Sequence, residues 1–177
     1  MLSALYAGTL RKLLPPNARR LVQVGCGDGT LASAYKQCYP ASLWQGVERD
    51  AEAAALARRH CDLVHQANVD TVGAPFFAHL AMSDAWIFDQ TLHHSADPLA
   101  LLRRIRAVLA ADACVLIVLP GYPVWANEGL PRADSPQAVA VLLAQAGYTA
   151  GAAAPLATPG ATPADGPAPL LITAFPA

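Results

Sequence analysis

The sequence predicts an α/β fold in which a doubly wound, mostly parallel sheet of seven strands has helices on both faces. Two observations predict it. Short, continuously apolar segments alternate with segments that have helical starts and helical spacing, which is the pattern of buried parallel strands and crossover helices. This alternation runs through a chain of 177 residues, a length typical of one domain. The segment 148–177 is too short for another crossover helix, so we expect an antiparallel closing pair of strands there.

The first half of the chain predicts a leading helix within residues 1–20, followed by strand–helix units. The leading helix has one apolar stripe and is expected to end before Pro15; the stripe comprises Leu2, Leu5, Tyr6, Thr9, Leu10 and Leu13. Asp50 has the residue type of a helix cap. Strands are expected at residues 21–24, 43–47 and 62–66, helices at 30–38 and 51–59, and an irregular or helical connection at 72–82.

In the second half, two dipeptides mark helix starts. Asp97-Pro98 and Ser135-Pro136 each place a capping side chain before a first-turn proline. The first of these helices has its apolar face at Leu99, Leu102, Ile105 and Leu109. Gly147 is expected to end the second. Strands are expected at residues 85–88, 114–119, from 148 onward and 170–175, with a long turn rich in Pro, Gly and Ala at 158–169.

Composition limits the function classes. The net charge is −1 and only 14% of residues are charged, which argues against disorder and against electrostatic capture of nucleic acid or an anionic membrane. No apolar stretch reaches the length of a membrane span, and residues 1–14 lack the basic leader of a signal peptide. The four cysteines form no C-x-x-C pair and no metal-ligand pattern. We therefore expect reduced thiols, no metal and a cytoplasmic location.

A glycine-rich turn follows the first strand. Gly25, Gly27 and Gly29 stand where parallel strands present their carboxyl ends to ligands. Glycines there allow a sharp turn and a close approach of the backbone to a ligand, and the helix that follows favours a negative group at its start. A dinucleotide fingerprint, G-x-G-x-x-G, would require glycine at position 30, where Thr30 stands.

The segment Val22-Gln23-Val24-Gly25-Cys26-Gly27-Asp28-Gly29 resembles motif I of the class I S-adenosylmethionine (SAM)-dependent methyltransferases. The later segments of that family are echoed in order by Glu48 at the end of the second strand and by residues 67–70, 89–94 and 97–109. The resemblance covers about residues 21–119 and implies the strand order 3-2-1-4-5-7-6, with strand seven antiparallel. It also implies SAM, or its product S-adenosylhomocysteine (SAH), as the cofactor.

The resemblance further implies a set of cofactor-binding residues. Glu48 can accept hydrogen bonds from both ribose hydroxyls. Asn68 stands where the family usually has an acid, and its carbonyl can still accept from the adenine amine. Ordinary turn chemistry is the alternative for Asn68 and Asp70. The full predicted set is Gly25, Cys26, Gly27, Asp28, Gly29, Glu48, Arg49, Asn68, Val69, Asp89, Gln90 and Thr91.

The acceptor side is less defined. His93 and His94 are candidates for a catalytic base, which is needed only where the acceptor must lose a proton; packing near the cofactor is the alternative. Tyr122 and Trp125 lie in the predicted substrate-side loop 121–134 and are candidates for stacking on an acceptor. The segments that would cover the acceptor are short. We therefore expect an open site for a small-molecule, glycan or carrier-linked acceptor, or one completed by a homodimer or a partner enzyme.

Three other functions are weighed against this one. A non-catalytic module with the same fold is favoured by Asn68 and by His93, which stands at the usual position of a glutamate. A nicotinamide-dependent oxidoreductase is disfavoured by Thr30. A nucleic-acid methyltransferase is disfavoured because no N-P-P-Y-type motif follows the fourth strand and no basic stripe is visible.

Overall fold

The computed structural model describes residues 3–15, 18–121, 135–156 and 168–177. Its strands form one sheet in the order β3-β2-β1-β4-β5-β8-β6, and β7 pairs with β8. The strands are β1 Arg20–Val24, β2 Leu43–Glu48, β3 Leu63–Gln66, β4 Ala85–Asp89, β5 Cys114–Leu119, β6 Tyr148–Ala150, β7 Ala154–Pro155 and β8 Leu170–Pro176. The helices are α1 Ser3–Leu13, α2 Thr30–Lys36, α3 Ala51–Ala57, α4 Ala74–His79, α5 Pro98–Arg106 and α6 Pro136–Gln145, with a 3-10 turn η1 at Leu92–His94.

The strand order confirms the predicted fold class, with β8 in the place of the predicted seventh strand. Pairs β1–β2, β1–β4, β2–β3 and β4–β5 are parallel. β8 runs antiparallel to both β5 and β6. Beside the predicted strand order the structure adds the two-residue β7, which has no apolar run of its own that could have predicted it. It forms through pairing with Leu170 and Leu171 of β8.

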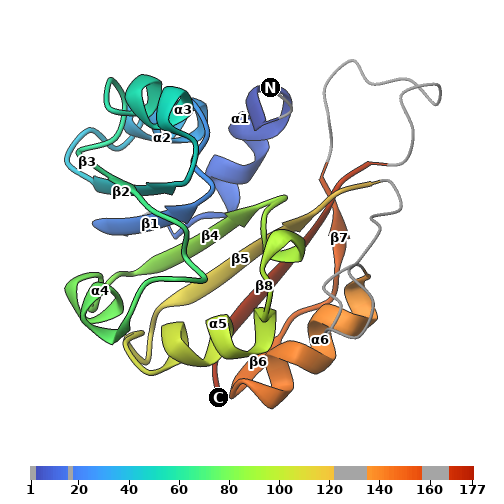
Figure 1. The fold of residues 1–177 in the computed structure, drawn as a ribbon. Coiled ribbons are helices and arrows are strands. Elements are labelled where there is room, and N and C mark those ends of the chain that lie inside the picture. The colour runs from blue at the N-terminus through green and yellow to red at the C-terminus, as the bar shows by residue number, and fades with distance from the viewer. Residues whose placement is uncertain (1–2, 16–17, 122–134, 157–167) are drawn as a thin grey trace.

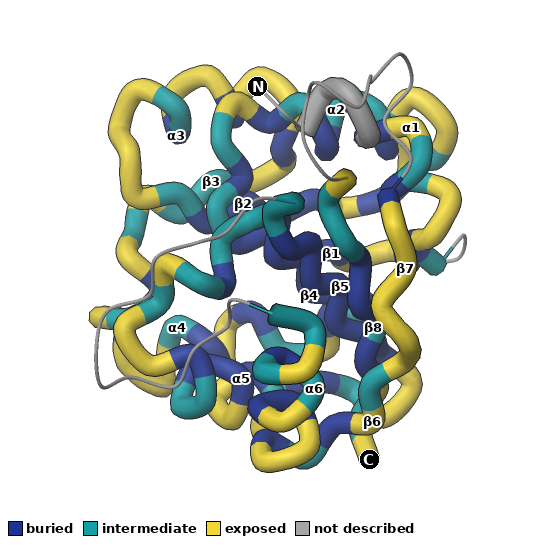
Figure 2. Tube along the Cα trace, turned by 90° about the vertical axis from the view of Figure 1, so that its right-hand side faces the viewer, coloured by how far each residue is buried: buried dark blue, intermediate teal, exposed yellow. Residues whose placement is uncertain are grey.

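Helices cover both faces of the sheet: α1, α2 and α3 lie on one face and α4, α5 and α6 on the other (Figure 1). Successive side chains of a strand point to opposite sides, so with helices on both faces the central strands are buried on both. In β4, Trp86 and Phe88 belong to the core beneath α4, α5 and α6, whereas Ala85 and Ile87 belong to the core beneath α1 and α2. Figure 2 shows β1, β4 and β5 as the buried centre of the molecule.

The predicted helix caps are confirmed. The side chains of Asp50, Asp97 and Ser135 accept hydrogen bonds from backbone N–H groups three residues later, at 2.8, 2.9 and 3.2 Å. Such caps satisfy donors that a helix leaves unpaired at its start. Gly147, which follows α6, has φ of +84°, the conformation in which glycine commonly ends helices.

Two predicted helix faces are rotated in the structure. In α1, Leu13 is 49% exposed, while Ala7, Leu10 and Leu14 are buried. The helix ends at Leu13, within the predicted range 1–20, and Leu14 continues the buried face after it. Leu2, Leu5 and Tyr6 lie outside the side chains that the structure describes.

In α5, Leu101 is buried although the sequence prediction left it out, and Leu99 is only partly buried. The face in contact with the sheet therefore includes Leu101, Leu102 and Ile105, a wider stripe than the predicted one. In the described parts of the chain, no helix is long and apolar enough to cross a membrane.

Candidate functional site

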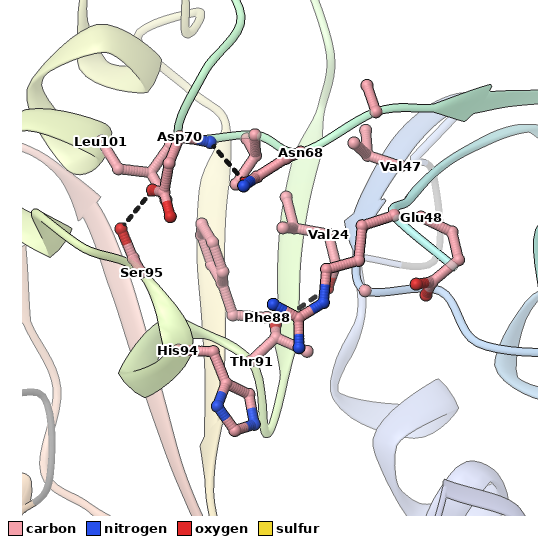
Figure 3. Close-up of a pocket in the computed structure, with 14 residues that line it drawn as sticks. Val24, Val47, Glu48, Asn68, Asp70, Phe88, Thr91, His94, Ser95 and Leu101 are labelled. Atoms are coloured by element: carbon pink, nitrogen blue, oxygen red, sulfur yellow. Dashed lines mark hydrogen bonds between the residues drawn. The ribbon is translucent and has the colours of Figure 1, made fainter. Parts of the chain in front are cut away.

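A cavity of about 200 Å³ opens at the carboxyl ends of β1, β2, β3 and β4. This is the edge at which open parallel sheets bind ligands. Figure 3 shows Glu48 and Val47 on one side of it, Asp70, Ser95 and His94 on the other. It is lined by Val24, Gly25, Val47, Glu48, Arg49, Ala67, Asn68, Val69, Asp70, Phe88, Thr91, His94, Ser95 and Leu101.

Gly25 is glycine because the loop after β4 lies against it. A Cβ on Gly25 would stand 2.2 Å from Cγ2 of Thr91, and the residue has φ of +69°. Thr91 is held there by its own hydroxyl, which donates to the Val24 carbonyl at 2.9 Å. The missing side chain of Gly25 therefore allows the turn after β1 to pack directly against the turn after β4.

Gly27 and Gly29 serve different purposes. A Cβ on Gly29 would lie 3.1 Å from Ala57 Cα and 3.1 Å from His60 Cβ, so this glycine lets the start of α2 pack on α3. A Cβ on Gly27, which has φ of +55°, would meet no heavy atom of the described residues within 4 Å. Only at Gly27 does the missing side chain leave open space beside the motif.

Cys26 and Asp28, which alternate with the three glycines, do not line the cavity. Cys26 is buried, and Gly46 of β2 makes room for it, because a Cβ there would lie 2.5 Å from the Cys26 Sγ. The Asp28 carboxylate accepts from the backbone N–H and the hydroxyl of Thr30 at 3.0 and 2.6 Å. The hydroxyl bond is the main reason why the pKa of Asp28 lies below its ordinary value.

Glu48 lies at the end of β2 with its carboxylate fixed between two backbone donors. Oε2 accepts from the Gly27 N–H at 2.9 Å, and Oε1 accepts from the Asp50 N–H at 3.0 Å. A carboxylate oxygen can accept more than one hydrogen bond, so both oxygens can still receive ligand hydroxyls. The contact with Gly27 ties the predicted ribose acceptor directly to the glycine loop.

The loop after β3 forms the opposite wall. Asn68 Oδ1 accepts from the Asp70 N–H at 3.0 Å, which is the turn chemistry weighed as the alternative for Asn68. The side chain nevertheless lines the cavity, as does Val69. The Asp70 carboxylate accepts from the Ser95 hydroxyl at 2.5 Å and from the Ala96 N–H at 3.1 Å.

The predicted residues of the turn after β4 differ in whether they reach the cavity. Asp89 is buried at the end of the strand. Gln90 has φ of +56°, and its N–H donates to the Val118 carbonyl at 3.0 Å, which redirects the chain after β4. Of the three residues predicted here, Thr91 lines the cavity, whereas Asp89 and Gln90 do not.

The structure separates the two histidines. Both rings lie in η1 with centroids 4.0 Å apart, but only His94 lines the cavity. Burial, followed by the neighbouring His94, lowers the pKa of His93 to about 4. Burial and then the charge of Arg49 lower the pKa of His94 below its ordinary value. At pH 7 the His94 imidazole is therefore neutral and can accept a proton.

Seven of the lining residues are absent from the predicted set, although Asp70 was considered together with Asn68: Val24, Val47, Ala67, Asp70, Phe88, Ser95 and Leu101. A signal existed for Val24, Val47 and Phe88, since each lies at or next to the carboxyl end of an apolar strand. Nothing in the sequence pointed to Ser95, which is brought in by the fold. The predicted acceptor contacts Tyr122 and Trp125 lie outside the described residues.

Solved structures of other proteins share this fold. Solved structures with this fold include a SAM-dependent methyltransferase from Aquifex aeolicus, with a TM-score of 0.72 at 14% identity, covering 99% of this chain and 92% of that one. The mitomycin 7-O-methyltransferase MmcR gives 0.71 at 20% identity, with 99% and 54% covered. The O-methyltransferase NcsB1 from neocarzinostatin biosynthesis gives 0.68 at 19% identity, with 97% and 54% covered.

The chain thus spans only about half the length of some of these structures. A comparison with curated proteins gives no match. A family model described as a methyltransferase domain matches residues 2–150, which include the glycine motif, Glu48 and the whole lining of the cavity. The chain belongs to the methyltransferase domain family.

Proposed function

We propose that the chain binds SAM in this cavity and transfers its methyl group to a hydroxyl acceptor. One observation carries the proposal: the Glu48 carboxylate, bonded to the Gly27 N–H at 2.9 Å, faces a cavity whose far wall is the loop 67–70. A carboxylate beside a glycine turn, opposite an apolar and amide wall, suits an adenosine group with its two adjacent ribose hydroxyls.

The residues present fit SAM in three respects. Glu48 has acceptor capacity for the ribose hydroxyls. Val69 and Asn68 line the cavity and offer apolar area and an amide to an adenine ring. The open space beside Gly27 leaves room for a ligand to cross the glycine loop, which a Cβ would fill. Cys26, Asp28 and Gly29 act in this proposal by holding the loop, and Arg49, Thr91 and Gly25 by shaping the cavity.

Bound SAM supplies an electrophilic methyl group on its sulfonium. The chain's own contribution is to hold donor and acceptor in line, since positioning supplies much of the rate in such a displacement. Neutral His94 lines the cavity and would accept the proton that an acceptor hydroxyl loses. His93 does not line the cavity, so we assign it a packing role.

For the acceptor we propose a small molecule, with a glycan- or carrier-linked hydroxyl as the wider class. One structure with this fold, NcsB1, is described in complex with SAH and 1,4-dihydroxy-2-naphthoic acid. This supports a small hydroxylated acceptor. A screen of phenols and hydroxylated ring compounds, read by SAH formation, is the direct approach.

A second candidate, a non-catalytic module, is favoured by Asn68. Its Oδ1 is already engaged by the Asp70 N–H, and it is an amide where the family usually has an acid. This candidate predicts weak or absent cofactor binding and no methyl transfer to any acceptor in the screen.

Calorimetric titration with SAH tests the proposal. We expect micromolar affinity in the wild type and a loss of about tenfold or more in Glu48→Ala, or about 1.4 kcal/mol. Glu52→Ala is the matched control, because Glu52 is an exposed acid in the first turn of α3. No binding by folded wild-type protein, or equal weakening by both substitutions, contradicts the proposal.

A further inference from the structure

The loop after β3 and the turn after β4 meet at the cavity through one carboxylate. Asp70 and Ser95 are 25 residues apart in the sequence, yet Asp70 Oδ1 accepts from the Ser95 hydroxyl at 2.5 Å. Asp70 Oδ2 accepts from the Ala96 N–H at 3.1 Å. Figure 3 shows Asp70 and Ser95 joined in this way next to His94. Both acceptor oxygens of Asp70 are thus used by the segment that carries His94.

Asp70 is itself held in place. Its N–H donates to Asn68 Oδ1 at 3.0 Å. The Thr71 N–H donates to the Asn68 carbonyl at 3.1 Å, and the Ala67 N–H donates to the Glu48 carbonyl at 3.0 Å. The carboxylate therefore projects from a loop that is anchored to the end of β2 and folded on itself.

The partner segment is held at its start, where the Thr91 hydroxyl donates to the Val24 carbonyl and Leu92 is buried in the core, whereas the residues around His94 also make local bonds. The His94 N–H donates to the Thr91 carbonyl at 3.0 Å, and the Ser95 N–H donates to the Leu92 carbonyl at 3.1 Å. These bonds shape η1 but do not fix it against the opposite wall. The contacts of Asp70 with Ser95 and Ala96 supply that fixation directly beside His94.

We propose that Asp70 is a positioning residue, which holds His94 against the cofactor cavity through its bonds to Ser95 and the Ala96 N–H. This rests on the proposed function, since it gives His94 its use. Asp70 acts through hydrogen-bond geometry. The causes that lower the pKa of His94 are burial and then the charge of Arg49. The neighbouring groups that can also affect His94 are His93 in the same turn and, across the cavity, Glu48.

Substitutions at Asp70 separate geometry from charge. Asparagine can keep both bonds: its Oδ1 can accept from the Ala96 N–H while its amide donates to the Ser95 oxygen. Asp70→Asn therefore removes the charge and keeps the connection, whereas Asp70→Ala removes both. Ser95→Ala removes only the 2.5 Å bond. Asp112→Asn, an exposed acid in the turn before β5, is the control for charge alone.

Two measurements on the full chain test the proposal. The first is the pKa of the His94 imidazole, followed by NMR without any ligand and assigned with His94→Gln. We expect that pKa to rise toward its ordinary value in Asp70→Ala and, less so, in Ser95→Ala. His94 is exposed as a residue, but its ring is partly desolvated where it lines the cavity, and it loses this desolvation when the turn moves away. Asp70→Asn and Asp112→Asn should leave it at the wild-type value. The second is SAH affinity, which we expect to fall about tenfold in Asp70→Ala and to be restored in Asp70→Asn.

An unchanged His94 pKa in both Asp70→Ala and Ser95→Ala overturns the proposal, and so does an Asp70→Asn variant that behaves like Asp70→Ala. If Asp70→Ala does not fold, an unchanged His94 pKa in Ser95→Ala by itself overturns the proposal. The NMR readout needs no cofactor, so failure of SAH to bind the wild type contradicts the proposed function while the positioning of His94 is still tested.

Discussion

Substituting Gly25 with alanine tests the packing of the glycine loop after β1. Two costs add. Alanine at φ of +69° carries about 1–2 kcal/mol of backbone strain. Its Cβ would also stand 2.2 Å from Thr91 Cγ2, an overlap that requires repacking at about 1–3 kcal/mol. We therefore expect Gly25→Ala to lower the free energy of unfolding by about 2–5 kcal/mol in urea titrations.

A double-mutant cycle isolates the second cost. Thr91→Ser deletes Cγ2 and keeps the hydroxyl that donates to the Val24 carbonyl. Alone it should cost about 1 kcal/mol for the lost methyl group. In the Gly25→Ala background it should instead restore about 1–3 kcal/mol, since the next atom, Thr91 Cβ, would be 3.1 Å away. Gly8→Ala in α1, where no described atom lies within 4 Å of the new Cβ, is the control and should be mildly stabilising. Additive effects of the two substitutions at Gly25 and Thr91 would refute the argument.

Two further predictions concern the loop and the histidines. Gly27→Ala should lower the free energy of unfolding only by the backbone strain at φ of +55°, about 1–2 kcal/mol. It should nevertheless weaken SAH binding more than tenfold in calorimetry, because the new Cβ occupies the space left for the ligand. Wild-type affinity in this variant would show that the ligand does not cross Gly27. The pKa of His93 is about 4 in the folded protein against an ordinary value of 6.5. As the pH falls, the unfolded chain therefore binds a proton on this ring before the folded chain does. The free energy of unfolding should therefore fall between pH 6.5 and pH 4, with a shallower slope in His93→Gln, as measured by urea unfolding at several pH values; an unchanged slope would show that His93 does not contribute.

Local signals in the sequence were enough to predict most of the fold. Asp50, Asp97 and Ser135 each occupy a helix start that the residue type and a following proline or alanine run make recognisable, and each forms the predicted cap. The continuous apolar runs likewise predict strands that are buried on both faces. What local patterns could not settle is which side of a helix meets the sheet, as Leu13 and Leu101 show.

The parts of the candidate site that could be predicted are those where the residue type itself indicates the backbone conformation. Gly25, Gly27 and Gly29 all have positive φ, as a glycine turn requires. The sequence could not show what each missing side chain is for: Gly25 allows packing against Thr91, Gly27 leaves open space, and Gly29 allows packing on α3. It also could not show the bonds between Asp70 and the segment of Ser95, because a contact between residues 25 positions apart leaves no local pattern in a single sequence.

The prediction for His93 and His94 illustrates the same limit. They are adjacent and chemically equal in the sequence, and only the turn η1 decides that His94 lines the cavity while His93 packs beside it. That assignment depends on the loop contacts of the fold.

A crystal structure of the chain with SAH tests the central claim most directly. We expect the adenosine group in the cavity between Glu48 and Val69, with the ribose hydroxyls donating to the Glu48 carboxylate. We expect the rest of the ligand to cross Gly27 toward the turn of Thr91. SAH bound elsewhere, or crystals grown at saturating SAH with this cavity empty, would contradict it.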